Sequence, residues 1–179
     1  MKNIYSFLRH VYVFFFIVMF FTGIAYAESS FDKGMKEFRE ENYEEALRYF
    51  QDARKVDPKS TTAAFYLGLT YKILEDPVSA IPHLRDAVTY TPRIKEALVE
   101  LIDALIQTDK LEEAKKWIEV AEKDKITPAR VQFLKGIGLL KENKYEDAIA
   151  AFEKAKQLDK NLTQAADFQI ANAYMRLGK

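Results

Sequence analysis

The sequence predicts an all-α solenoid in which pairs of helices stack side by side. Three observations support this prediction: small and apolar residues recur every 34 residues, no insertion interrupts the first four copies, and each copy holds two stretches with helical periodicity. A repeat of this length is typical of arrays whose units bury their apolar faces only against neighbouring units.

The recurring residues occupy four registers. These are Gly34, Gly68 and Gly136, with Ile102 in the third copy; Ala46, Ala80, Ala114 and Ala148; Ala53, Ala87, Ala121 and Ala155; and Phe50, Leu84, Ile118 and Phe152. We expect the small residues to let the two helices of a repeat approach closely. We interpret Gly138 in the same way as Gly136, because no strand precedes Gly136-Ile137-Gly138 as a phosphate-binding loop would require.

These residues resemble the tetratricopeptide repeat, whose consensus has Leu-Gly and Tyr in its first helix, small and large apolar residues in its second, and Pro at its close. The second copy matches best, with Leu67, Gly68, Tyr71, Ala80, Leu84, Ala87 and Pro92. The third copy departs most, with Ile102 for Gly and Leu105 for Tyr. The resemblance covers about residues 30–179 and implies a right-handed α-solenoid of four helix-turn-helix repeats plus one terminal helix. It implies no particular ligand, because one architecture serves many functions.

The N-terminal residues 1–27 have the features of a secretory signal peptide. Lys2 and Arg9 precede the apolar run 11–21, and Ala25-Tyr26-Ala27 offers small residues for cleavage after Ala27. The alternative is an uncleaved inner-membrane anchor through residues 11–27. Cleavage would remove two of the 27 basic residues and none of the 27 acidic ones, for a net charge of −2. We therefore expect an exported, periplasmic protein, with repeats at about 28–60, 61–94, 95–128 and 129–162 and a terminal helix at 163–177.

Helix boundaries follow from capping residues. In the first repeat we expect helices over 31–40 and 43–56, with Ser29 and Ser30 near the first N-terminus. Asn42, Asp76, Asp109 and Asn143 are the candidate N-caps of the second helices. Pro77 and Pro128 fit first helical positions, whereas Pro82 should bend its helix.

Few residues could support catalysis. Residues 28–179 contain one histidine, His83, which we expect to face solvent, and the chain has no cysteine. We find no nucleophile motif, paired metal ligands or phosphate loop, so we predict a non-enzyme without cofactor or small-molecule substrate. The balanced charge argues against nucleic-acid binding. Trp117, the only tryptophan, should pack in the core or on the convex surface.

A second face of each first helix forms the candidate partner-binding groove. Residues at spacing i, i+4, i+7 define this face, which the resemblance places on the concave side of the solenoid. They are Phe31, Met35, Phe38, Phe65, Leu69, Lys72, Val99, Asp103, Ile106, Phe133, Ile137, Leu140, Phe168, Asn172 and Met175. An apolar groove suits an apolar peptide or an amphipathic helix. The alternative is packing between repeats, since apolar stripes at helical spacing also form cores.

The family's clamp for C-terminal carboxylates uses Lys and Asn at places where this chain has Phe31 and Met35. An acidic-tail partner is therefore not expected. We expect instead a non-catalytic scaffold or adaptor that binds another envelope protein. The alternatives are the N-terminal segment of a longer membrane or envelope protein, suggested by Ile170, Tyr174 and Leu177 facing a missing helix, and a module that self-associates.

Overall fold

A computed structural model describes residues 28–90 and 94–178, and these residues form paired antiparallel helices without a strand. The predicted signal peptide and Pro92 lie outside the described residues. The helices are α2 (Ser30–Arg39), α3 (Tyr43–Val56), α4 (Thr61–Ile73), α5 (Pro77–Thr89), α6 (Lys95–Gln107), α7 (Leu111–Lys123), α8 (Pro128–Lys141), α9 (Tyr145–Leu158) and α10 (Thr163–Arg176), with a short 3-10 turn at Lys160–Leu162. The predicted all-α fold is confirmed.

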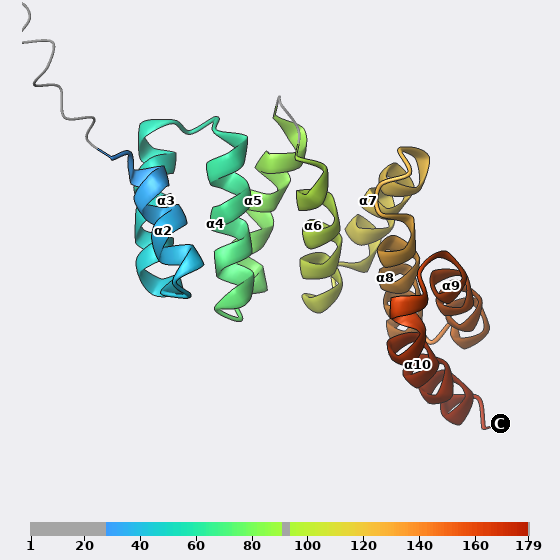
Figure 1. The fold of residues 1–179 in the computed structure, drawn as a ribbon. Helices are drawn as coiled ribbons and strands as arrows, with labels where there is room; N and C mark the ends of the chain where they lie inside the picture. The colour runs from blue at the N-terminus through green and yellow to red at the C-terminus, as the bar shows by residue number, and fades with distance from the viewer. Residues whose placement is uncertain (1–27, 91–93, 179) are drawn as a thin grey trace, which may run out of the picture.

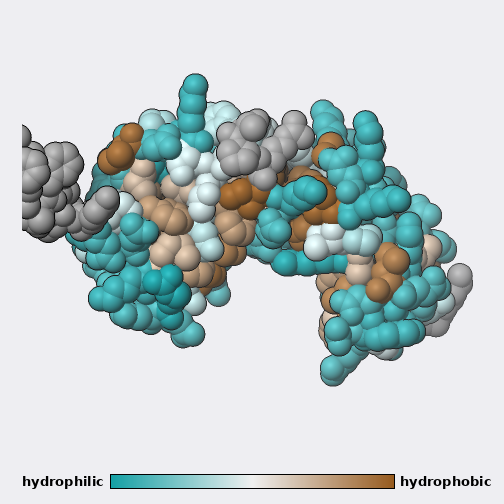
Figure 2. Space-filling view, turned by 45° about the horizontal axis from the view of Figure 1, so that its top comes forward, coloured by the Kyte–Doolittle hydropathy of each residue, from teal (hydrophilic) through white to brown (hydrophobic). Residues whose placement is uncertain are grey.

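The helices form two rows (Figure 1). The first helices of the pairs, α2, α4, α6, α8 and α10, line one side, and the second helices, α3, α5, α7 and α9, lie behind them. Each helix packs against the next one along the chain, and successive members of the first row also touch from α4 to α10. We call the first row the A-row and the second the B-row. The space-filling view shows an arched array in which apolar side chains gather between hydrophilic margins (Figure 2).

Close packing within repeats explains the glycine register. A Cβ on Gly34 would lie 2.7 Å from the Phe50 ring, and one on Gly136 would lie 2.6 Å from the Phe152 ring. Both distances are far inside van der Waals contact, so the prediction is confirmed at these sites. Gly138 differs, because its Cβ would meet nothing nearer than Ile106 Cδ1 at 3.8 Å. The expectation that Gly138 serves close helix packing was wrong.

Helix starts agree with the sequence in part. The side chain of Ser29 accepts a hydrogen bond from the backbone N–H of Asp32 at 3.1 Å, and that of Asp76 accepts one from Ser79 at 3.0 Å. Asn42 precedes α3 without such a bond and instead donates to Glu37. Of these three predicted caps, Ser29 and Asp76 are therefore confirmed.

Each turn between paired helices contains a residue in the left-handed backbone conformation. In two turns this residue had been predicted as an N-cap. Asp109 and Asn143 are not N-caps, because they lie one residue earlier with φ of 57° and 60°. Glu41 and Glu75 occupy the same register with φ of 63° and 59°. This register ends the first helix of each pair and is a position that glycine would satisfy without strain.

Prolines begin two helices as predicted. Pro77 and Pro128 stand in the first turns of α5 and α8, where a missing N–H costs no helical hydrogen bond. Thr127 lies before Pro128 with φ of 36° and does not cap through its side chain. Pro82 lies inside α5 on its exposed side. In the part of the chain that the structure describes, no helix combines the length and apolarity needed to cross a bilayer.

Candidate interaction surface

The N-terminal part of the A-row is an aromatic cluster shared by the first two repeats. The ring centroids of Phe31 and Phe50 lie 5.7 Å apart. Those of Phe38 and Tyr66 lie 5.6 Å apart, with the rings edge to face. Met35 packs against the same cluster. Phe50 is fully buried, whereas Phe31, Met35 and Phe38 are half-buried, so these three contribute to the core and leave part of their surface to solvent.

The middle of the A-row combines buried apolar residues with ion pairs. Val99 and Ile106 are 2% exposed and belong to the core, so they offer no surface to a partner. Phe65 and Leu69 of α4 are half-buried. Lys72 reaches across to α6, where its Nζ lies 2.5 Å from both Glu100 Oε2 and Asp103 Oδ2.

The Lys72 network ties together three repeats. Arg130 of α8 contacts the second oxygen of Glu100 at 2.7 Å, which extends the network from α4 through α6 to α8. The Lys72 side chain is only 9% exposed. Burying an ammonium group is costly unless its partners are close, and two carboxylates supply that compensation. The network fixes neighbouring repeats and presents no free cation at this point.

Sequence reasoning identified Lys72 and Asp103 but missed Glu100 and Arg130. Their pairing joins residues about one repeat apart, which a search along a single helix does not detect. The sequence did contain a signal for this network, because residues of opposite charge lie almost one repeat length apart.

The C-terminal part of the A-row is more open. A depression of about 400 Å³ between α8 and α10 brings together the predicted residues Ile137, Leu140 and Asn172. Its polar margin includes Arg176, whose Nε donates to Asn172 Oδ1 at 3.3 Å. Phe133 packs on Phe152 with ring centroids 5.3 Å apart and is half-buried.

Phe168 and Met175 are the most accessible apolar side chains of the predicted set, at 70% and 71% exposure. They lie on α10 with Asn172 at i, i+4, i+7 spacing, which places all three along one side of the helix. This arrangement leaves the C-terminal end of the A-row with an accessible apolar stripe beside the α8–α10 depression.

His83 does not face solvent as predicted. It is half-buried and stacked on Tyr71, with ring centroids 5.6 Å apart and planes 5° from parallel. Burial, with a smaller contribution from the nearby Arg54 guanidinium, lowers the pKa of His83. Tyr71 also accepts a hydrogen bond from Gln51 at 2.9 Å. The stacking joins α5 to α4 within the second repeat, and the hydrogen bond from Gln51 of α3 links this pair to the first repeat.

Other chemically capable groups are dispersed. Trp117 is half-buried in the central core, and its Nε1 donates weakly to Glu113 at 3.4 Å. Within residues 28–90 and 94–178, no group of three or more histidine or acidic side chains could hold a metal ion.

Comparisons with known proteins agree with this architecture. The tetratricopeptide repeat family matches residues 31–89, and the family described as the TT21 fifth ARM repeats domain matches residues 69–175. No curated protein matches the sequence.

Several solved structures share the fold. A crystal structure of MamA is 24% identical with a TM-score of 0.74, covering 83% of this chain and 81% of that one. Pseudomonas aeruginosa PilF is 23% identical with a TM-score of 0.68, covering 82% of this chain and 67% of its own. A chain of the APC/C hetero-tetramer Cut9–Hcn1 is 18% identical with a TM-score of 0.68, and the match covers 83% of this chain but only 30% of that one.

The paired helices, the glycine packing and these matches define a helical-repeat solenoid protein. The chain belongs to the family described as the TT21 fifth ARM repeats domain, whose match covers more than half of it, and residues 31–89 match the tetratricopeptide repeat.

Proposed function

We propose that this protein is a non-catalytic scaffold of the bacterial cell envelope that binds an apolar peptide or amphipathic helix of another envelope protein along its A-row. The observation that carries the proposal is the accessible stripe of Phe168 and Met175 beside the depression formed with Ile137 and Leu140. An amphipathic helix buries a row of apolar residues in such a surface, and polar groups at its margin fix its register. Asn172 supplies such a group here.

The envelope setting rests on the N-terminal sequence. Lys2, Arg9, the apolar run and the Ala25-Tyr26-Ala27 ending together favour export. N-terminal sequencing of the protein purified from cells tests this part. A chain beginning at Glu28 in the periplasmic fraction supports it, and an intact N-terminus in the cytoplasm contradicts it.

A protein partner is also in keeping with the fold. Cut9, a structural neighbour, is described in a hetero-tetramer with Hcn1. Solenoids present extended surfaces because each repeat adds one more helix to the same side. The A-row of this chain extends over five helices, of which α10 is the most accessible.

Photo-crosslinking in cells tests the surface. A photoreactive residue replaces Phe168, and the matched control replaces Val78, which is 61% exposed on α5 in the B-row. We expect a discrete adduct with an envelope protein from position 168 alone. Equal adducts from both positions, or none from position 168 in a folded and exported protein, would overturn the proposal. An adduct with the mass of two chains would replace it with self-association.

A further inference from the structure

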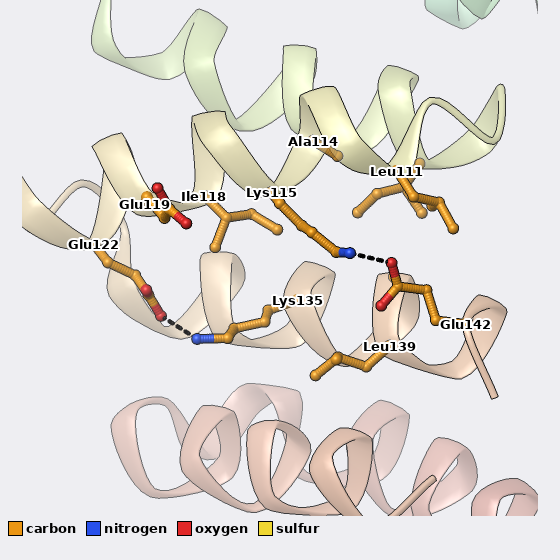
Figure 3. Close-up of a pocket in the computed structure, with 11 residues that line it drawn as sticks. Leu111, Ala114, Lys115, Ile118, Glu119, Glu122, Lys135, Leu139 and Glu142 are labelled. Atoms are coloured by element: carbon orange, nitrogen blue, oxygen red, sulfur yellow. Dashed lines mark hydrogen bonds and ion pairs between the residues drawn. The ribbon is translucent and has the colours of Figure 1, made fainter. Parts of the chain in front are cut away.

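The junction between the third and fourth repeats contains an apolar pocket that the proposed A-row surface does not use. The pocket has a volume of about 200 Å³ and lies between α7 and α8. Its floor is apolar, formed by Ile106, Leu111, Ala114, Ile118, Gly138 and Leu139. Figure 3 shows two ion pairs that cross from α7 to α8, Lys115 to Glu142 at one end and Lys135 to Glu122 at the other.

The pocket exists because this junction departs from the chain's own repeat pattern. Lys135 stands in the register that Leu67, Leu101 and Ile170 fill as buried residues, whereas the first copy has the exposed Lys33 there. Lys115 stands where the other copies have Leu47, Ile81 and Ile149. Each lysine turns its ammonium group to a carboxylate across the junction, so the apolar volume that a leucine or isoleucine would fill is left open.

Gly138 keeps the floor of the pocket open. The same register holds Thr70, Ala104 and Ala173, all of which are fully buried. A Cβ on Gly138 would make only ordinary contact with Ile106, so no neighbour requires a glycine there. Glycine inside a helix is less stable than alanine. At Gly138 this loss of stability is not offset by a close approach of two helices. Its effect in the structure is to enlarge the pocket.

The charges around the pocket favour one kind of occupant. The lining contains three carboxylates, from Glu119, Glu122 and Glu142, and two ammonium groups, from Lys115 and Lys135. In the described residues the Glu119 carboxylate has no ion-pair partner, whereas the other four groups are paired. An apolar cavity of comparable size stays dry and accepts a ring the size of benzene. The lining therefore has a net negative charge, which disfavours an anionic occupant. A cation bound next to an apolar occupant would lie near the Glu119 carboxylate.

We propose that this pocket binds one uncharged, bulky side chain of a protein partner, aromatic or branched aliphatic, that is flanked by a basic residue. The proposal rests on the proposed function in one respect, namely that the partner is a protein. The pocket would hold an anchor side chain, and such anchors carry much of the binding in protein interfaces. Glu119 of α7 lines this pocket and is placed to meet that basic residue.

Methyl NMR of the full chain tests the proposal with three defined probes. These are indole, the capped tripeptide acetyl-Lys-Trp-Lys-amide and its acidic counterpart acetyl-Glu-Trp-Glu-amide. We expect saturable shifts at the methyl groups of Ile106, Leu111, Ile118 and Leu139, and none at Leu47. The basic peptide should bind about threefold tighter than the acidic one, as weak surface charge pairing gives.

Two filled variants provide the control. Lys135→Leu introduces the leucine that the second and third copies have at this position, and Gly138→Ala adds one methyl group to the floor. A protein that carries both substitutions should bind each of the three probes at least tenfold more weakly. Its methyl spectrum should remain dispersed, which shows that it is folded. Phe168→Ser should leave probe binding unchanged, so failure of the A-row proposal does not affect this test.

Three results would overturn the proposal. The first is the absence of saturable shifts with indole and with both peptides. The second is equal binding to the wild-type protein and the filled variant. The third is binding of indole without either peptide, which would identify the occupant as a free small molecule rather than a side chain.

Discussion

Two glycines of α8 have opposite surroundings although they lie two residues apart. Gly136 faces the Phe152 ring so closely that a Cβ would lie at 2.6 Å, whereas a Cβ on Gly138 would make only ordinary contact with Ile106 at 3.8 Å. The 34-residue period predicted the first of these environments, because Gly34 and Gly68 share its register. It could not predict the second, because Gly138 is a glycine only in the fourth copy.

We therefore expect alanine to have opposite effects at the two sites. Gly138→Ala should raise the free energy of unfolding by about 1 kcal/mol, the usual difference between alanine and glycine inside a helix. Gly136→Ala should lower it by about 1–3 kcal/mol, because the added methyl group must displace Phe152. Urea denaturation of both variants measures these changes. A destabilised Gly138→Ala protein would show that α6 and α8 approach each other more closely at Gly138 than the 3.8 Å distance to Ile106 indicates.

His83 gives the packing of α5 against α4 a pH dependence. Burial lowers its pKa below the ordinary value of 6.5, so the folded protein resists a proton that the unfolded chain accepts. The groups around it are Tyr71, Arg54 and Asp86, and Arg54 is itself paired with Asp86.

The sign of the effect follows from proton linkage. Because the unfolded chain binds more protons than the native state as pH falls through 6.5, the contribution of His83 is complete above about pH 7 and declines below 6.5. His83→Gln should flatten the thermal stability of the protein between pH 7.5 and 5.5 in comparison with wild type. A wild-type protein that gains stability over this fall in pH, with the variant flat, would contradict the account.

At the scale of helices, the helix positions were largely predictable and the contacts between helices were not. The predicted helix over 43–56 is α3 as observed, and the helix expected over 31–40 is α2 within one residue. Periodicity and capping are local signals, which explains this success. The Lys72 network and the stacking of His83 on Tyr71 depend on which helices meet in space. That information is spread over residues of different helices and, for the Lys72 network, of different repeats.

The Lys72 network should contribute more to the free energy of unfolding than the surface ion pairs of the chain do. Lys72→Met keeps the apolar stem but leaves Asp103 without its cation and Glu100 with Arg130 alone. We expect the free energy of unfolding to fall by about 2–3 kcal/mol, because largely buried carboxylates lose a partner. Chemical denaturation checks this value.

Lys55→Met is the matched control for the Lys72 variant. Lys55 pairs with Asp52 on the surface of α3, where its side chain is 75% exposed. Its replacement should change the stability little, because water screens such pairs. Equal effects of the two substitutions would show that the network between α4, α6 and α8 does not hold the repeats together.

At the scale of the whole molecule, the A-row changes character along its length. Aromatic packing closes the first two repeats, ion pairs cross the middle, and an apolar stripe remains open on α10. The sequence predicted one continuous groove, because helical spacing alone does not distinguish a residue that faces a partner from one that faces the next repeat. Val99 and Ile106 illustrate this, since both share the spacing and both are buried.

Co-purification from cells tests most directly whether the open end of the A-row binds a partner. The test protein carries Phe168→Ser and Met175→Ser, and the control carries Val78→Ser and Leu158→Ser, which remove exposed apolar residues of the B-row. Circular dichroism should show that both variants fold. We predict that an envelope protein captured by the wild-type chain is lost with the first variant and retained with the second. Its retention by the first variant, or its loss only from the second, would contradict the assignment of the binding surface to the A-row.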